Sequence, residues 1–224
     1  MCGRFAQGEF PASIRKIMRE LLEEVTADYN IAPGDKARVI VQEEGRVPAL
    51  RRCEWGFPPP WEPKPGKPPP LRLFNARCET VAEKPSFRNA FRRRRCLVPA
   101  LGFYEWQLAP GRKIPHCFAA ADEARPLVLG GIWDDIRGVR AFSILTTEAN
   151  ALIRPVHDRM PVILPPEDWL DWLNPAQEDR LLLDTMMRPV TADYLRTWEV
   201  SPLVTLPGNK GPACFQPLSG GQLF

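Results

Sequence analysis

The stretch CLVPALGFYEWQ, residues 96–107, decides how the rest of the chain is interpreted. It is rich in β-branched and aromatic residues, which favour strands, and the residues Pro-Ala-Leu-Gly interrupt it near its middle. The segments after it continue the pattern: PHCFAAA (115–121), PLVLGGIWDD (126–135) and RAFSILTT (140–147) each have the composition of a strand. Strands therefore dominate the middle of the chain and do not alternate regularly with helices.

Earlier segments add strands and a helix. ARVIVQ (37–42) and VPALRRCEW (47–55) predict two strands around the turn EEGR. PASIRKIMRELLEEV (11–25) has apolar residues at helical spacing, with Pro11 suited to the first turn. Three later helix candidates are EKPSFRNAFRRRR (83–95), PPEDWLDWL (165–173) and QEDRLLLDTMM (177–187). This order predicts the α+β class, with a largely antiparallel β core and peripheral helices.

The composition is that of a globular protein. The 224 residues are 44% hydrophobic and 25% charged, and this length favours one domain with one sizeable core. The net charge is only +3, which is compatible with a nucleic-acid partner but does not argue for one. The basic residues cluster, however, and the arginine run 92–95 is either a solvated face or a set of phosphate contacts.

Several classes of protein are excluded by what the sequence lacks. The six cysteines form no CxxC pair and no Cys/His cluster with zinc-ligand spacing, so no metal site is predicted. There is no apolar region typical of a signal peptide and no run of 18 apolar residues, which excludes a membrane span. We therefore expect a cytoplasmic protein with reduced cysteines.

The start of the chain, MCGRFA, places a cysteine at position 2, where sequence usually matters least. If Met1 is removed, Cys2 carries a free α-amine and a thiol on adjacent carbons. An internal cysteine lacks that pair. Cys2 is therefore a candidate nucleophile.

Glu105 is a candidate acid–base residue, because it lies among Phe103, Tyr104 and Trp106. A carboxyl group among aromatic rings loses solvent, which raises its pKa toward the range of a general acid. The alternative is that strand alternation points Glu105 to solvent while Tyr104 and Trp106 face the core.

The polar residues at turns have ordinary and functional interpretations. His157 lies in PVHDRMP, a turn predicted to follow a short helix in the segment 148–164, whereas His116 lies in a strand-like run where ordinary packing is favoured. Asn75 in FNAR could cap a turn, with Arg77 on the same strand face. The proline-rich stretch 57–70 is either a stiff linker or a rigid loop that presents Trp61 beside a site.

Taken together, these motifs carry a resemblance. MCGRF, YNIAPG, WGF, FNARCET, PSFRNAFRRRRCLVPALGFYEW and HDRMPVIL occur in one order over nearly the whole chain. The sequence resembles the SOS response-associated peptidase family, whose members process abasic sites in DNA. The resemblance implies one domain over residues 1–224, with a distorted β-barrel core.

The resemblance also implies a reaction and its residues. Family members bind single-stranded DNA and its junctions with duplex, and they crosslink covalently to abasic sites. Carried over, the catalytic residues are Cys2, Asn75, Glu105 and His157. The amine of Cys2 attacks C1′ of the opened sugar to give a Schiff base, and the thiol then closes a thiazolidine ring. Strand cleavage by β-elimination is a possible side activity, and no metal or organic cofactor is needed.

DNA contacts follow from the same resemblance. Arg4, Arg77 and Thr146 are expected at phosphates, and Arg88 with the run 92–95 would extend that track. Asn30 and Pro33 would line the site. Trp61 would stack on a base or wedge at a junction.

Two other functions stay open at this point. A thiol peptidase with Cys2 as its terminal nucleophile would turn over peptides, as the family name suggests. A non-catalytic module for single-stranded DNA would tolerate loss of the Cys2 thiol. A monomer is the default expectation for the oligomeric state.

Overall fold

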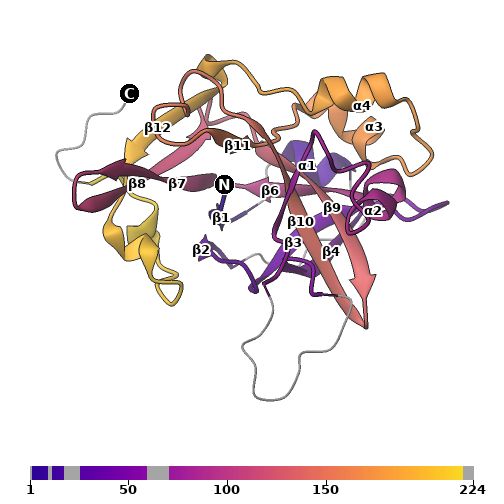
Figure 1. Cartoon of the computed structure of the whole chain (residues 1–224), viewed down its shortest axis with the longest axis horizontal. Coiled ribbons are helices and arrows are strands. Elements are labelled where there is room, and N and C mark those ends of the chain that lie inside the picture. The colour runs from indigo at the N-terminus through magenta and orange to yellow at the C-terminus, as the bar shows by residue number, and fades with distance from the viewer. Residues whose placement is uncertain (1, 10–11, 18–25, 60–70, 219–224) are drawn as a thin grey trace.

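The computed structural model of the chain describes residues 2–9, 12–17, 26–59 and 71–218 (Figure 1). The strands are β1 (Arg4–Gln7), β2 (Asp28–Ile31), β3 (Lys36–Val41), β4 (Ala49–Trp55), β5 (Asn75–Arg77), β6 (Arg95–Ala100), β7 (Gly102–Ala109), β8 (Arg112–Ala120), β9 (Leu127–Ile136), β10 (Val139–Glu148), β11 (Arg159–Pro161) and β12 (Leu195–Glu199). The α-helices are α1 (Ala12–Ile17), α2 (Arg88–Arg93), α3 (Trp169–Leu173) and α4 (Arg180–Met186). Short 3₁₀ helices cover Pro166–Asp168, Ala192–Tyr194, Pro202–Thr205 and Pro212–Cys214.

Strands β10, β4, β3, β6 and β9 close into a barrel, because β9 also pairs with β10. β5 and β11 extend it by pairing with β10. The predicted α+β fold with a distorted barrel core is confirmed. The barrel is mixed rather than purely antiparallel, since β10 runs parallel to both β4 and β5.

The remaining strands form a second, antiparallel sheet in the order β12-β8-β7-β1-β2. The stretch 96–107 joins the two sheets, because its first half is β6 of the barrel and its second half is β7. The break at Leu101 is where the chain changes sheet. Gly102 is required there, since a Cβ at this position would lie 2.8 Å from the backbone oxygen of Phe118.

The core between the barrel and the second sheet fixes β1, the strand that carries the start of the chain. Phe5 of β1 packs edge-on against Trp55 of β4, with ring centroids 5.0 Å apart. Trp55 also stacks on Phe142 of β10. All three side chains are fully buried, and burying each aromatic side chain contributes about 1.5–3 kcal/mol. The amino-terminal strand is therefore held as firmly as the core.

The predicted helices are found in part among the described residues. The candidate at 11–25 contains α1, and residues 11 and 18–25 lie outside the described residues. The candidate at 83–95 forms α2 from Arg88 onward. The short helix expected at the start of 148–164 is wrong, because residues 151–156 form consecutive turns.

The arginine run 92–95 forms ion pairs and hydrogen bonds within the protein. Arg92 pairs with Glu178, Arg93 with Glu44 and Arg94 with Asp134. Arg95 is 1% exposed and donates hydrogen bonds to five backbone carbonyls, those of Phe91, Arg92, Trp172, Asn174 and Gln177. Four identical side chains at the α2–β6 boundary therefore divide into three surface ion pairs and one buried anchor for α3.

Arg95→Met is expected to destabilise the protein by about 3 kcal/mol or more, because it leaves buried carbonyls without a donor. Burial lowers the pKa of Arg95 to about 10, so the group stays charged at neutral pH, and the carbonyls compensate this charge together with the Trp172 ring, whose centroid is 5.9 Å from the guanidinium carbon. Urea unfolding would measure the change. The control is Arg92→Met, which removes an exposed ion pair worth at most about 1 kcal/mol. Equal midpoints for the two variants would contradict the assignment.

Among the described residues, no helix has the length and apolar character needed to cross a membrane. All six cysteines are free and buried.

Candidate active site

Cys2 lies immediately before β1 and is fully buried. Its Sγ lies 3.7 Å from the carbonyl oxygen of Arg4. β1 is held on both sides, because Phe5 pairs with Ile31 of β2 and with Phe103 of β7. Position 2 is thus an ordered part of the core and not a frayed end.

Asn75 reaches Cys2 from the barrel. It begins β5, and its backbone pairs with Ile144 of β10. Its side-chain Nδ2 donates a hydrogen bond to the Cys2 carbonyl oxygen at 2.8 Å. Its Oδ1 is buried and accepts no hydrogen bond from the described residues, which leaves an acceptor beside the start of the chain.

Glu105 lies on β7 and is only 3% exposed. The alternative that it points to solvent is wrong. Phe103, on the same strand face, stacks on Phe118 at 5.3 Å, while Tyr104 on the other face donates to the Tyr29 carbonyl oxygen at 2.7 Å. Alternation did not decide the matter, because both faces of β7 are covered here. Burial raises the pKa of Glu105, and the charge of His157 partly opposes this rise.

His157 directly follows the consecutive turns 151–156. The side chain of Asn150 holds the backbone at the start of these turns. Asn150 Oδ1 accepts from the backbone N–H groups of Leu152 and Ile153 at 3.1 Å each. His157 Nδ1 lies 2.9 Å from the backbone nitrogen of Arg159 and 2.9 Å from Asp158 Oδ1. One nitrogen cannot accept from the first and donate to the second at once. A ring with its proton on Nε2 accepts from Arg159, whereas a ring with a proton on Nδ1 donates to Asp158.

Glu105 and His157 line the same cavity, which has a volume of about 640 Å³. Its other walls are Arg4, Trp106, Leu108, Lys113 and Thr205. Cys2 is not one of the lining residues; burial raises the pKa of its thiol, and the charge of Glu105 adds to this rise. The cavity thus brings a buried carboxyl and a histidine together beside two cations and an indole ring.

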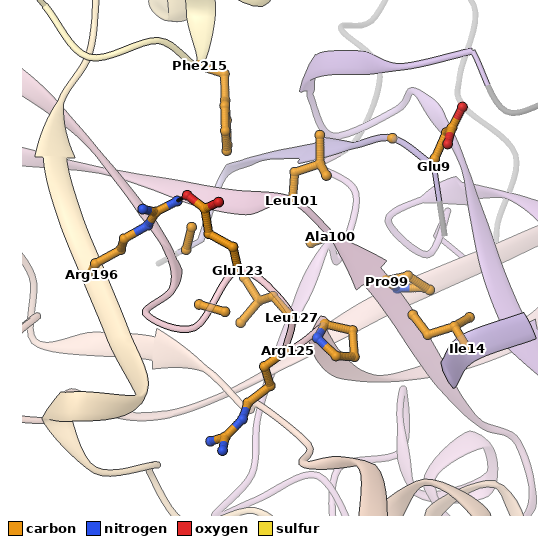
Figure 2. A pocket seen from close by; sticks show the side chains of 14 residues that line it. Glu9, Ile14, Pro99, Ala100, Leu101, Glu123, Arg125, Leu127, Arg196 and Phe215 are labelled. Carbon is orange, nitrogen blue, oxygen red and sulfur yellow. Dashed lines mark hydrogen bonds and ion pairs between the residues drawn. The ribbon is translucent and has the colours of Figure 1, made fainter. Parts of the chain in front are cut away.

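A second cavity, of about 370 Å³, lies where β6 and β8 end and beside β12 (Figure 2). Its walls are mainly apolar and include two carboxylates, Glu9 and Glu123, of which Glu123 forms an ion pair with Arg196 at 2.8 Å. Its lining includes no cysteine or histidine. The chemistry-bearing residues are in the first cavity.

The predicted DNA contacts divide into accessible and buried residues. Arg77 of β5, Pro33 and Arg88 are exposed, and Arg88 lies on α2, at the opposite side of the molecule from the β7–β8 hairpin (Figure 1). Arg4 lines the cavity and donates to Asn30 Oδ1 and to the carbonyl oxygens of Val204 and Thr205. It therefore joins β1 to the carboxy-terminal segment.

Two of these residues are structural in this conformation. Thr146 is fully buried and donates to the Ala76 carbonyl oxygen at 3.5 Å, which places it between β10 and β5 and not at a surface. Asn30 is also fully buried and donates to the carbonyl oxygens of Leu206 and Asn209. The phosphate contact of Thr146 and the place of Asn30 beside the site remain predictions. Trp61 lies outside the described residues.

The structure adds residues that sequence reasoning did not select. Trp106 is half-buried and lines the cavity, and its place in GFYEW could have indicated it. Lys113 lines the cavity because the β7–β8 hairpin pairs it with Leu108. The turn dipeptide Pro110-Gly111 between the two strands could have indicated this hairpin. No group of three or more carboxylate, histidine or cysteine side chains suited to a metal ion occurs in the described part of the chain.

Asn75→Ala is expected to slow the reaction of Cys2 about 10- to 100-fold, because one hydrogen bond and one free acceptor beside the nucleophile are lost. The single-turnover rate of adduct formation on abasic-site DNA would measure this. Thermal unfolding serves as the control, since a fall in rate with an unchanged melting temperature isolates positioning from folding. A rate equal to that of the unaltered protein would show that Asn75 has no role in the reaction of Cys2.

Comparisons with known proteins bear on this site. A family model described as SOS response associated peptidase (SRAP) matches residues 1–207. The abasic site processing protein YoqW of Bacillus subtilis is 37% identical over 224 residues, covering 95% of this chain and 97% of that protein. The abasic site processing protein YedK of Escherichia coli is 31% identical over 184 residues, covering 77% of this chain and 79% of that protein.

Solved structures share the fold. A crystal structure of a protein from Bacteroides thetaiotaomicron matches with a TM-score of 0.77 at 24% identity, covering 96% of this chain and all of that one. One from Bordetella bronchiseptica matches with a TM-score of 0.70 at 26% identity, covering 89% of this chain and all of that one.

Proposed function

Because the chain belongs to the SOS response-associated peptidase family, we propose that it processes abasic sites in DNA by bonding Cys2 covalently to the opened sugar. One observation carries the proposal. Cys2 is buried beside a carboxyl group with a raised pKa, and Asn75 holds its backbone carbonyl. Met1 lies outside the described residues, and its removal is part of the proposal.

The first bond forms between the Cys2 amine and C1′ of the ring-opened deoxyribose. An α-amine has a reference pKa of about 7.7–8.0, well below that of lysine at about 10.4, so a useful fraction is neutral near pH 7. The neutral amine adds to the aldehyde to give a carbinolamine. Asn75 Oδ1, a buried acceptor that has no hydrogen-bond partner among the described residues, would accept an N–H hydrogen bond and orient the amine.

Glu105 then gives and regains one proton. Its raised pKa keeps a protonated fraction that donates to the carbinolamine hydroxyl, and water leaves. The Cys2 sulfur adds to the resulting iminium carbon, and the S–H proton returns to the Glu105 carboxylate. The product is a neutral thiazolidine and one water molecule. The high effective molarity of a thiol on the neighbouring carbon favours ring closure.

His157 serves the earlier opening of the sugar. Opening a hemiacetal requires a base for the C1′ hydroxyl and an acid for the ring oxygen, and Glu105 and His157 line the same cavity. His157 Nδ1 lies within hydrogen-bond distance of both the Arg159 backbone nitrogen and Asp158, which would hold the ring in place during this step. His157 would also serve strand cleavage by β-elimination, a side activity of the same Schiff base.

The cavity walls suit a single strand of DNA. Arg4 and Lys113 supply positive charge for phosphates, and Trp106 supplies a face on which a base can stack. Arg77 is exposed two residues after Asn75 and extends the basic surface along β5. We expect a monomer that acts in the cytoplasm on single strands and on their junctions with duplex.

The test mixes the purified protein with three single-stranded oligonucleotides: one with an abasic site, one with a tetrahydrofuran analogue that has no aldehyde, and one undamaged. The expected result is a heat-stable adduct with the abasic strand only. Its intact mass should equal the sum of the two components less Met1 and less one water. Confirmed loss of Met1 with no adduct on any strand would overturn the proposal.

A peptidase acting in trans is the alternative that the family name raises. It would need a Cys2 thiolate, and burial together with the Glu105 charge raises the pKa of this thiol and opposes its ionisation. The amine route requires no thiolate. Repeated turnover of a peptide library, with products increasing beyond one per protein, would favour the peptidase, and one adduct per abasic site favours the crosslink.

A further inference from the structure

Three titratable side chains form a row across the second sheet. Glu105 of β7 pairs directly with His116 of β8, and His116 pairs directly with Glu199 of β12. Residues paired across antiparallel strands lie on the same face, with Cβ atoms about 4.5–5.5 Å apart. The register therefore places an imidazole between two carboxyl groups.

The row leads from the interior to solvent. Glu105 is 3% exposed, His116 is partly buried and Glu199 is exposed. Phe103 and Phe118, the preceding pair on the same face, are fully buried, so the row lies at the edge of the core. A proton that leaves Glu105 along this row would have a short route to solvent.

His116 has no structural duty that explains its imidazole. Its Nε2 is buried and has no hydrogen-bond partner among the described residues. Its ring lies 6.5 Å from that of Phe118, a contact that any planar side chain could make. Burial lowers the pKa of His116, and the charge of Glu199 opposes this change. The ring is thus neutral near pH 7 and able to accept a proton.

The proposed reaction has a proton to dispose of. Near pH 7 the Cys2 amine starts mostly as an ammonium, and the thiazolidine nitrogen at the end is neutral. The balance is ammonium plus aldehyde plus thiol giving thiazolidine, water and one H⁺. Glu105 exchanges one proton within the cycle, so this additional proton must leave a buried site. Above about pH 8 the amine enters neutral, and no proton has to leave.

We propose that His116 and Glu199 conduct this proton from Glu105 to solvent, an inference that rests on the proposed function. Glu105 transfers the ammonium proton to His116, directly or through one water molecule, and His116 passes it to Glu199 and bulk water. His157 and Asp158 also face Glu105, from the turns before β11, and Glu199 faces His116 from β12. His116 acts through Glu105 and is a positioning residue for proton transfer, not a catalytic residue.

The experiment measures single-turnover adduct formation from pH 6 to pH 9 for the unaltered protein, His116→Gln, His116→Ala and Glu199→Gln. Both His116 variants are expected to be about tenfold slower at pH 6.5 and close to the unaltered rate at pH 9. Glu199→Gln should show a smaller loss in the same direction. Added imidazole should restore His116→Ala at pH 6.5, because the site is partly exposed, and it should not accelerate the unaltered protein. Glu123→Gln removes an exposed carboxylate outside the row and is expected to have no effect.

The outcomes separate this inference from the proposed function. Variants that slow equally at every pH, or that imidazole does not restore, would overturn the proton path and leave the crosslink standing. An unaltered protein that forms no adduct would overturn both. His116→Gln keeps a planar polar side chain, so a folding defect confined to His116→Ala still leaves the pH profile to decide.

Discussion

Cys2→Ala is expected to abolish the heat-stable adduct with abasic-site DNA while leaving a trappable imine. Alanine at position 2 keeps the α-amine and removes the thiol, so the reaction stops at the Schiff base, which hydrolyses. Borohydride reduction before denaturation should therefore recover a covalent product from Cys2→Ala. Without borohydride, denaturing gels should show none. Cys2→Ser should resemble alanine, because its hydroxyl is a weaker nucleophile than a thiol toward the iminium carbon.

The matched control is another buried cysteine. Cys78→Ala removes a free, buried thiol that directly follows β5, a strand of the barrel sheet, whereas Glu105 lies in the second sheet. Its adduct yield should equal that of the unaltered protein. A loss of adduct in Cys78→Ala as large as that in Cys2→Ala, or a heat-stable adduct from Cys2→Ala without reduction, would contradict the thiazolidine.

Much of this site could be predicted because its residues lie in short motifs whose local chemistry is unusual. A cysteine at position 2, an acid among aromatic residues and a histidine in a polar turn each point to chemistry before any fold is known. The structure brings Glu105 and His157 to one cavity and Asn75 to the Cys2 carbonyl. Strand alternation could not decide the orientation of Glu105, since alternation predicts burial only where one face of a sheet is covered.

The structural roles that the sequence did not predict depend on distant parts of the chain. Thr146 donates its hydroxyl hydrogen bond to β5, because β10 pairs in parallel with β5. No local sequence pattern predicts this pairing. Asn30 donates a hydrogen bond to the Asn209 carbonyl oxygen in the carboxy-terminal segment, about 180 residues away. Arg95 differs from its three neighbours only because β6 begins there and turns its side chain under α3. Sequence type alone could not separate a phosphate contact from a buried anchor.

Glu105→Gln is expected to slow adduct formation about 10²- to 10⁴-fold, the usual contribution of a general acid–base residue. Glutamine has nearly the same shape and can still bond to neighbours, but it cannot give a proton to the carbinolamine or take one from the thiol. Single-turnover rates at saturating abasic-site DNA would measure the loss. Glu83→Gln, which changes an exposed carboxylate, is the control and should not alter the rate.

The same substitution should make the protein more stable above pH 5, the reverse of its effect on activity. Burial raises the folded-state pKa of Glu105 above its ordinary value of 4.5, so the folded protein binds more protons than the unfolded chain once pH exceeds that value. Stability contributed by the neutral carboxyl is fully present below the unfolded pKa and is lost as pH rises through the folded pKa. Glutamine removes this dependence. Urea unfolding at pH 4 and pH 8 should therefore show similar midpoints at pH 4 and a higher midpoint for Glu105→Gln at pH 8. A variant that is less stable at pH 8 would mean that Glu105 holds the fold together, whereas a gain in stability with a loss of rate identifies a carboxyl kept in an unfavourable place for its chemistry.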